Sequence, residues 1–333
     1  FDGTDAGAAS NTLTLTIDDG AATGGATKTL NGVAFTDLAS VTIDGSVDDS
    51  GTTLTSLTAS ADNTDITVNA GANGVTLAGT TTLGTGDLVI NSSAAIAAGA
   101  TVLTATSLTT SGAGALTMTA IDVAKLPTVT TDSGADALTI SGTGATSTIS
   151  TGAGNDTVTL GAATQATFTY TINAGDGALD TLVLGDTVDY SAGTIALSGF
   201  ERISLALDAG GANTAVTVAN ANITGQSFIM STNDAAVNTV TVSMAAAEAI
   251  SDLSNLVFDA NFSAANDIMK ITNNVTTNLT LTGSDMIDQF TSGAGNDTMT
   301  GGAGADVLNA AAGNNTIDGG AGDDVITTTT GTD

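Results

Sequence analysis

The chain has 333 residues, with 34 acidic and four basic side chains, a formal net charge of −30, and neither histidine nor cysteine. This charge excludes non-specific nucleic-acid binding, which needs Lys and Arg against phosphate. The missing His and Cys exclude imidazole and thiolate catalysis, disulfides and the usual zinc sites, so that oxygen ligands suited to Ca²⁺ or Mg²⁺ remain.

Short runs in which Thr alternates with aliphatic residues recur along the chain, and this period of two predicts half-buried β-strands. In chain order the runs are residues 13–17, 75–77, 116–118, 168–172, 240–242 and 279–281. Gly, Asp and Asn between the runs predict turns. A Ser N-cap and an Ala-rich body predict one short helix near 243–253.

These elements predict an all-β fold. Aromatic residues make up only 3% of the chain, which is low for the bulky core of a β-sandwich. A narrow solenoid accepts Ala, Val, Ile, Leu and stacked Thr in its interior, so we expect an elongated right-handed parallel β-helix or β-roll-like solenoid. For residues 1–131 a sandwich is the alternative.

Composition and repeats divide the chain into four segments. Residues 1–131 are expected to form a β-rich N-terminal segment, and residues 132–190 a β-roll-like segment with repeat-like turns. Residues 191–281 form a β-rich segment that includes the short helix. Residues 282–333 form a β-roll of nonapeptides, which therefore carries the clearest sequence signal.

That last segment contains five consecutive frames of nine residues without an insertion. The frames begin at Gly283, Ser292, Gly301, Ala310 and Gly319. Their sixth place holds Asp or Asn and their eighth place holds an apolar residue. Residues 151–159, TGAGNDTVT, carry nearly the same pattern as residues 292–300, SGAGNDTMT.

The frames resemble the RTX nonapeptide G-G-x-G-x-D-x-U-x, and this resemblance implies a calcium-bound parallel β-roll with RTX turns. The match is near-complete in Gly301-GAGADVLN and Gly319-GAGDDVIT, good in residues 292–300, and degenerate in the other two frames. A weaker patch spans residues 132–183, where Gly175-DGALDTLV places Asp180 in the sixth position.

The spacing itself predicts where cations would bind. Two nonapeptides close one coil, so carboxylates 18 residues apart stack about 5 Å from each other and repel unless a cation lies between them. Glycines at places one, two and four permit turns that aim carbonyl oxygens inward. We expect several Ca²⁺ ions, held by Asp288, Gly293, Gly295, Asp297, Gly302, Gly304, Asp306, Asn315, Gly320, Gly322, Asp324, Asp136, Gly152, Gly154, Asp156 and Asp180.

A second resemblance concerns the whole chain. Leu197-SGFERISLAL is similar to the strand entry F-E-x-(I/L)-x-L of large secreted bacterial repeat proteins. Together with the Thr, Ala, Gly and Asp bias, the chain is most similar to the lattice-forming region of RTX-type S-layer proteins of Gram-negative bacteria. The resemblance implies type I secretion and an extracellular S-layer that self-assembles. It also implies a cell-surface polysaccharide anchor bound through a region outside this chain.

No enzyme is expected, and no catalytic or organic-cofactor residue is assigned, because four dispersed cations and no Trp offer nothing for sugar or uronate recognition. The alternative functions are an RTX-type adhesin or biofilm-matrix protein and, third, the β-roll part of a secreted enzyme. The chain opens at Phe1 without a signal peptide, which is typical of a fragment or a processed chain. Surface acids are expected to share Ca²⁺ between neighbouring chains, namely Asp44, Asp48, Asp49, Asp62 and Asp65.

Overall fold

The computed structural model describes residues 12–17, 28–35, 38–46, 51–59, 64–99, 103–141, 146–161, 168–185, 188–191, 193–205, 215–232 and 237–333. Within these residues the regular structure is β-strand, apart from one 3₁₀ turn, η1 (Asn220–Asn222). The chain forms two compact units. The first comprises residues 1–163, 167–181 and 195–200, and the second comprises residues 164–166, 182–194 and 201–333.

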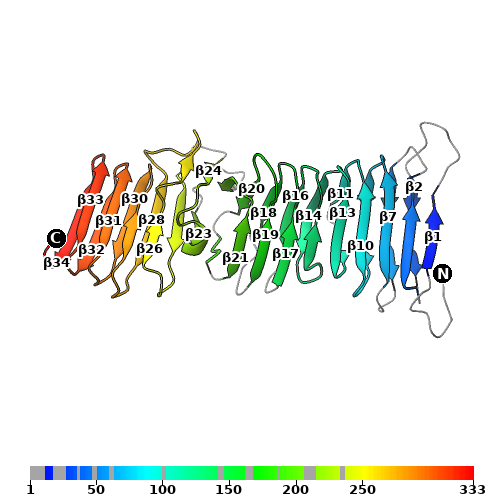
Figure 1. Cartoon of the computed structure of the whole chain (residues 1–333), viewed down its shortest axis with the longest axis horizontal. Helices are drawn as coiled ribbons and strands as arrows, with labels where there is room; N and C mark the ends of the chain where they lie inside the picture. Colours follow the sequence, from blue (N-terminus) through cyan, green and yellow to red (C-terminus); the bar gives the residue numbers. More distant parts are fainter. Residues whose placement is uncertain are drawn as a thin grey trace. The chain divides into compact units, whose positions relative to one another are not determined.

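The first unit is built from three parallel sheets, whose strands lie side by side in Figure 1. In spatial order, one sheet contains β1 (Thr12–Thr16), β4 (Ser40–Asp44), β7 (Asp65–Gly71), β10 (Asp87–Ser92), β13 (Ser107–Ser111), β15 (Thr128–Thr130), β17 (Thr146–Ser150), β19 (Thr169–Asn173) and β21 (Thr194–Ser198). The second contains β2 (Lys28–Leu30), β5 (Thr52–Leu54), β8 (Val75–Leu77), β11 (Ile96–Ala98), β14 (Leu116–Asp122), β16 (Ala137–Ser141) and β18 (Thr157–Leu160). The third contains β12 (Leu103–Thr104), β9 (Thr81–Thr82), β6 (Leu57–Ala59) and β3 (Val33–Phe35).

The second unit has the same construction. Four neighbouring strands of one parallel sheet are β20 (Thr181–Leu184), β22 (Arg202–Leu205), β24 (Ile229–Thr232) and β27 (Val257–Phe258). A six-stranded sheet contains β23 (Ala215–Ala219), β25 (Thr239–Ser243), β28 (Ile268–Asn273), β30 (Ile287–Ser292), β32 (Val307–Ala312) and β34 (Val325–Thr330). A four-stranded sheet contains β26 (Ile250–Asp252), β29 (Thr280–Thr282), β31 (Thr298–Ala303) and β33 (Thr316–Ala321).

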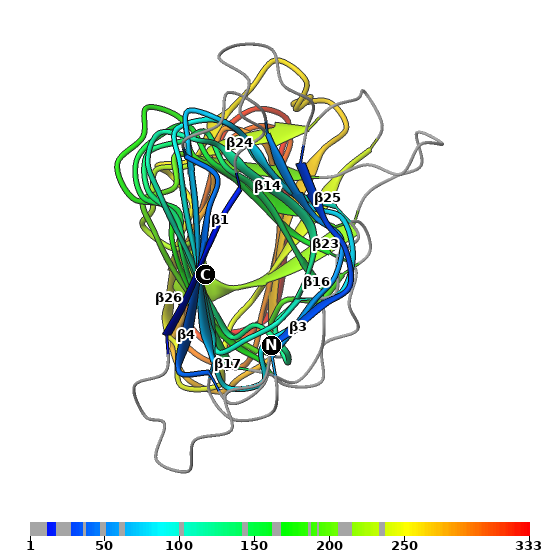
Figure 2. The same ribbon diagram turned by 90° about the vertical axis from the view of Figure 1, so that its right-hand side faces the viewer.

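Each strand pairs in parallel with the strand one coil later, which is the pairing of a solenoid. In the first unit Thr42 faces Thr67 and Thr67 faces Val89. Figure 2 shows β4 and β17 on one face of this unit and β14 and β16 on another. Parallel pairing between coils is incompatible with an antiparallel sandwich, so for the described part of residues 1–131 the predicted solenoid is confirmed and the sandwich alternative is wrong.

The core follows from the alternation that the sequence showed. Inward aliphatic residues of successive strands stack, and Ile43, Val68 and Ile90 are fully buried, whereas alternate residues such as Thr42 and Thr67 are only half-buried. In the C-terminal coils the eighth-place residues Phe290 and Leu308 are likewise fully buried. The eighth place therefore forms the interior of the roll, as expected.

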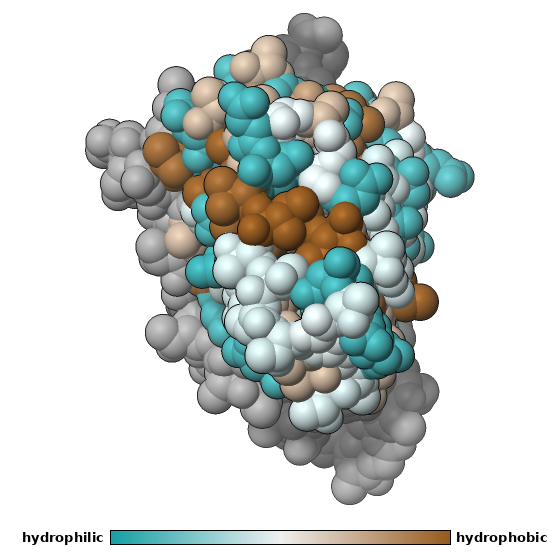
Figure 3. Space-filling model, turned by 90° about the vertical axis from the view of Figure 1, so that its left-hand side faces the viewer, coloured by the Kyte–Doolittle hydropathy of each residue, from teal (hydrophilic) through white to brown (hydrophobic). Residues whose placement is uncertain are grey.

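The last coil leaves part of this interior uncovered. Val325 and Ile326 in β34 are 56% and 47% exposed, although Ile326 stands in register with the fully buried Leu308. Figure 3 shows the resulting apolar band at this end of the second unit.

The helix predicted near 243–253 is wrong. Ser243 ends β25 and Ile250–Asp252 form β26, each in a parallel sheet. Between them the chain makes a single turn, in which the N–H of Glu248 donates to the carbonyl of Ala245 and the N–H of Ala245 donates to Glu248 Oε2 at 2.6 Å. Pairing of the flanking residues with neighbouring coils thus overrides the helix propensity of the four alanines in this segment.

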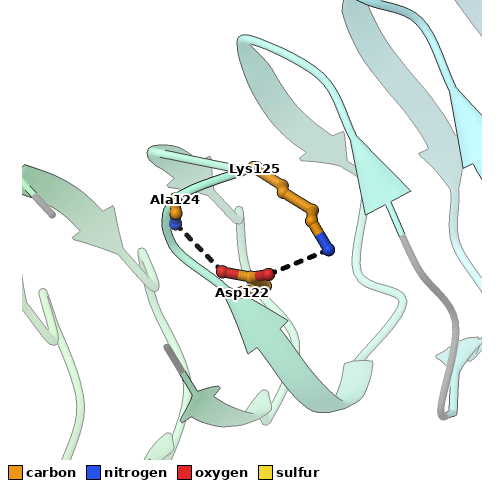
Figure 4. A network of polar contacts seen from close by, with 3 residues as sticks. All are labelled: Asp122, Ala124 and Lys125. Atoms are coloured by element: carbon orange, nitrogen blue, oxygen red, sulfur yellow. Dashed lines mark hydrogen bonds and ion pairs between the residues drawn. The ribbon is translucent and has the colours of Figure 1, made fainter. Parts of the chain in front are cut away.

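An α-turn lies directly before Pro127. The N–H of Leu126 donates to the carbonyl of Asp122, and the side chain of Asp122 caps the turn through the N–H of Ala124 (Figure 4). Lys125 lies 3.1 Å from the same carboxylate, in an exposed ion pair. The described part of the chain contains no helix of the length and apolarity needed to cross a membrane.

Candidate metal centre

The sixth-place acids of the Gly283, Gly301 and Gly319 frames form one row, here called the acidic row (Asp288, Asp306 and Asp324). The N–H of Asp288 donates to Oδ1 of Asp306 at 2.8 Å, and the N–H of Asp306 donates to Oδ1 of Asp324 at 2.9 Å. Each bond spans 18 residues, so it joins one coil to the next. The expected stacking of these three acids is therefore present.

A second row, the mixed row (Asp297, Asn315 and Asp333), lies at the other turns of the same coils. Oδ1 of Asp297 accepts from the N–H of Leu279 at 2.9 Å, and Oδ1 of Asn315 accepts from the N–H of Asp297 at 2.9 Å. Asp333 continues the row by accepting from the N–H of Asn315. Asp333 was missed in the sequence, although the frame that begins at residue 328 places it sixth.

The first unit contains a third row, the first-unit row (Asp136, Asp156 and Asp180). The N–H of Asp136 donates to Asp156 at 2.8 Å across 20 residues, and the N–H of Asp156 donates to Asp180 at 2.7 Å across 24 residues. The N–H of Leu116 donates to Asp136 in the same manner. Coils of unequal length thus produce the same carboxylate-to-amide bond as the strict 18-residue repeat.

In several of these carboxylates one oxygen accepts such a bond and the other is buried without a hydrogen-bond partner; in Asp288 the bonded oxygen, Oδ2, accepts from the N–H of Ser284 instead. The unpartnered atoms include Asp288 Oδ1, Asp297 Oδ2, Asp306 Oδ2 and Asp156 Oδ2, and the exposure of these residues is 1% or less. A buried carboxylate oxygen without a partner loses its hydration without compensation, which is costly. The arrangement therefore calls for a cation or a proton at each of these oxygens.

Burial has a direct effect on the pKa values of these acids. Loss of hydration is the main cause that raises the pKa of Asp288 to about 8; hydrogen bonds from Ser284 oppose this rise, and the neighbouring Asp306 adds to it. Burial also raises the pKa of Asp306 and of Asp156. The pKa of Asp136 is raised to about 6, again mainly by burial, although the hydroxyl of Thr131 donates to this carboxylate.

First-place glycines leave open space beside the acidic-row carboxylates. A β-carbon on Gly301 would lie closer than 3.0 Å both to Asp306 Oδ2 and to the carbonyl oxygen of Gly319. A β-carbon on Gly283 would meet Asp288 Oδ2 and the carbonyl oxygen of Gly301 in the same way. A carboxylate oxygen and a carbonyl oxygen of the next coil therefore converge over each bare α-carbon.

The glycines predicted at places two and four divide into two groups. Six of them have a positive φ that other residues rarely adopt, namely Gly152, Gly154, Gly302, Gly304, Gly320 and Gly322. The other two, Gly293 and Gly295, are required by space instead, because a β-carbon on either would lie closer than 3.0 Å to the backbone of the preceding coil. Glycine is therefore required at these eight positions for two different physical reasons.

One buried acid of the same type was missed. Asp267 is fully buried, and its Oδ1 accepts from the N–H of Asn238 at 2.7 Å while its Oδ2 accepts from the N–H of Ser263 at 2.6 Å. Residues 266–269, NDIM, resemble residues 296–299, NDTM, which was the available signal. Because amides satisfy both oxygens of Asp267, this position needs no cation.

Comparison with known proteins gives one result. Residues 139–163, 282–317 and 301–333 match the family model of the RTX calcium-binding nonapeptide repeat (4 copies). No curated protein and no solved structure matches the chain. The chain therefore carries RTX-type calcium-binding repeats, and proteins with such repeats are typically secreted.

The residues present fit calcium. Hard oxygen donors, buried carboxylate oxygens without partners and inward carbonyl oxygens are the donor set that Ca²⁺ takes, in six- to eight-fold coordination. Among the residues that the structure describes, no three acidic side chains cluster closely enough to hold a cation by themselves. Carbonyl oxygens must therefore supply much of any coordination shell.

Proposed function

We propose that this chain is a structural surface-layer protein whose folding and two-dimensional assembly depend on calcium. The observation that carries the proposal is the acidic row, in which hydrogen-bonded carboxylates join successive coils and keep buried oxygens free for a cation. Ligands for calcium are thus part of the contact between coils. A protein built in this way would fold where calcium is abundant and remain loose where it is scarce.

Charge provides the mechanism. A net charge of −30 opposes compaction, and buried carboxylates that face one another add to this repulsion. In the proposed sites Asp288, Asp306 and Asp324 hold Ca²⁺ with carbonyl oxygens of Gly301 and Gly319. Bound calcium neutralises the carboxylates and links the coils. A site occupied at 100 times its dissociation constant stabilises the folded chain by about 2.7 kcal/mol.

The side chains of the first-unit row and of the mixed row are proposed as further calcium ligands. The glycines at places two and four of their frames are proposed to add carbonyl oxygens. Asp180 shows how: a β-carbon on Gly177 would lie closer than 3.0 Å to both Asp180 oxygens and to the carbonyl oxygen of Gly154. These acids are spread along both units, so several ions are expected. Their role in this proposal is to link coils.

We also propose that the chain is not an enzyme. A hollow in the first unit is lined only by uncharged residues, namely Ser46, Asn69, Gly71, Asn91, Ser92, Ser93, Ser111 and Gly112. Side chains of these coils bond to one another, as when Asn91 Nδ2 donates to Asn69 Oδ1 at 2.7 Å. Such a lining supplies neither a general acid nor a nucleophile with a base beside it.

Contacts between chains are proposed to use surface acids and calcium, with cell-surface polysaccharide as the anchor of a region outside this chain. Of the five surface acids singled out, Asp48, Asp49 and Asp62 lie outside the described residues. Asp44 accepts from the N–H and the hydroxyl of Ser46, which lowers its pKa. It therefore stays ionised and available to a cation at neutral pH.

Electron microscopy across a calcium titration tests the proposal. Ordered sheets should form at millimolar Ca²⁺ and disperse when EGTA is added. A chain that folds with Ca²⁺ but stays monomeric at 10 mM would contradict the surface-layer proposal. That outcome would favour the RTX-type adhesin, which needs calcium for its fold but does not need to assemble.

A further inference from the structure

The two edges of the C-terminal roll differ in the side chains that join their coils. On the acidic row one side-chain bond joins each pair of coils, from Asp288 to Asp306 and from Asp306 to Asp324. The fifth-place residues beside this row are Ile287, Ala305 and Asp323. No carboxamide stands at the fifth place on this edge.

The mixed row has a second set of bonds beside it, formed by fifth-place asparagines. The N–H of Asn296 donates to Oδ1 of Asn278 at 2.8 Å, and the N–H of Asn314 donates to Oδ1 of Asn296 at 2.8 Å. The N–H of Thr332 continues the set by donating to Asn314 at 3.0 Å. These bonds point to the preceding coil, whereas the sixth-place bonds point to the following one. Each Asn-Asp or Asn-Asn pair therefore clamps its coil to both neighbours.

The charges of the two rows also differ. The acidic row carries a carboxylate in every coil. In the mixed row the neutral Asn315 separates Asp297 from Asp333, and the coil before Asp297 has Leu279 at the sixth place. Among buried row residues, Asp288 and Asp306 each have an oxygen without a partner, while the mixed row has one such residue, Asp297.

The acidic row also has more open space beside its carboxylates than the mixed row has. First-place residues along the acidic row are Gly283, Gly301 and Gly319, and a β-carbon on any of them would lie closer than 3.0 Å to a carboxylate oxygen. First-place residues along the mixed row are Ser292, Ala310 and Thr328, which all carry a β-carbon. Room for an ion next to the carboxylate is therefore kept on the acidic row and partly filled on the mixed row.

We infer that the two edges have different calcium requirements: the acidic row binds the tighter ions and depends on them, whereas asparagine bonds keep the mixed row closed at lower calcium. The inference rests on the proposed calcium dependence and adds to it an order of events. As calcium falls, the acidic row opens first, while the coils stay joined along the other edge. The roll would then hinge on its asparagines before it unfolds.

Amide hydrogen exchange of the full chain, followed by NMR at decreasing free Ca²⁺, tests this order. The donors of the acidic row, the N–H groups of Asp288 and Asp306, should exchange at least tenfold faster at a calcium level where those of Asn296 and Asn314 change less than threefold. Loss of protection at both edges at the same calcium level would overturn the inference.

Three conservative variants test separately whether the acidic row holds the tighter calcium ions. Asp306→Asn should weaken the tightest class of Ca²⁺ binding in isothermal titration at least tenfold. The matched variant Asp297→Asn should leave that class within twofold. Asn315→Asp, which adds a carboxylate to the mixed row, should strengthen only the weaker class. Equal losses from Asp306→Asn and Asp297→Asn would overturn the inference.

These measurements use dilute monomer. They therefore stand apart from the microscopy of assembly: a failure to form sheets would contradict the surface-layer proposal without touching the difference between the edges.

Discussion

The backbone N–H of Asp288 donates a 2.8 Å hydrogen bond to Oδ1 of Asp306, 18 residues later in the chain. This one contact sets the register between two coils and orients the carboxylate, whose other oxygen stays buried without a partner. A structural bond and an open ligand position thus belong to the same side chain. Folding and cation binding are therefore expected to be coupled.

Replacing Gly301 by Ala tests the space beside Asp306. The new β-carbon would lie closer than 3.0 Å to Asp306 Oδ2 and to the carbonyl oxygen of Gly319. Gly301 does not have a positive φ, so the effect comes from crowding alone. We expect a loss of about 1–3 kcal/mol in stability and weaker Ca²⁺ binding, measured by calorimetry.

Gly99→Ala is the control, because a β-carbon there has no heavy atom within 4 Å. Its effect on stability should stay within about 0.5 kcal/mol. If Gly301→Ala were equally harmless, the carboxylate of Asp306 would not lie beside the α-carbon of Gly301.

Stability of the calcium-free chain should fall as pH rises from about 4 to about 8. Burial raises the pKa of Asp288 in the folded chain to about 8, whereas an unfolded Asp titrates near 3.9. Between these values the unfolded chain releases a proton that the folded chain retains, so folding is disfavoured by up to about 1.4 kcal/mol per pH unit. Melting temperatures in EGTA at pH 5 and pH 8 measure this slope.

Calcium should reverse that slope, because a cation favours the ionised carboxylate. Asp288→Asn should flatten it in EGTA. A calcium-free chain that became more stable toward pH 8 would show that the buried acids are ionised without a metal.

Sodium chloride should replace calcium only in part. Screening weakens the general repulsion of a chain with a net charge of −30, but it does not coordinate the buried oxygens of Asp288 and Asp306. Circular dichroism in EGTA with rising NaCl should therefore recover less β-structure than millimolar Ca²⁺ does. Full recovery with salt would mean that repulsion, and not site binding, limits folding.

The loss of stability on truncating an interior side chain should depend on the coil in which that side chain lies. Leu308→Ala removes a fully buried side chain and should cost about 2–5 kcal/mol. Ile326 occupies the same place one coil later but is 47% exposed, so Ile326→Ala should cost less than half as much. Comparable losses in calorimetry would indicate that Ile326 is covered in solution.

The strands and the carboxylate rows could be predicted because they depend on local periods. Alternation placed Val75–Leu77 as β8, and the nine-residue frame placed Asp306 over Asp324. The helix near 243–253 was wrong because alanine propensity is a local property, whereas the pairing of Ile250 with Thr280 is set by another coil. Long-range pairing cannot be read from a short window.

Two parts of the site were not predicted from the sequence, for related reasons. Asp267 lies 29 residues after its donor Asn238, so no fixed spacing revealed it. The asparagines at 278, 296 and 314 look like ordinary turn residues in the sequence. Their role depends on which neighbouring coil the side chain reaches, and only the structure gives that direction.

The unlike edges of the roll constrain how such a repeat array can grow or shrink. Inserting or deleting nine residues would exchange the two edges for every later coil. Acidic-row carboxylates of the later coils would then stack on mixed-row residues, and the fifth-place asparagines would lose their partners in the neighbouring coil. A change of 18 residues would leave both edges and the interior in step. The heritable module of this array is therefore the pair of nonapeptides, and copies should be gained or lost two at a time.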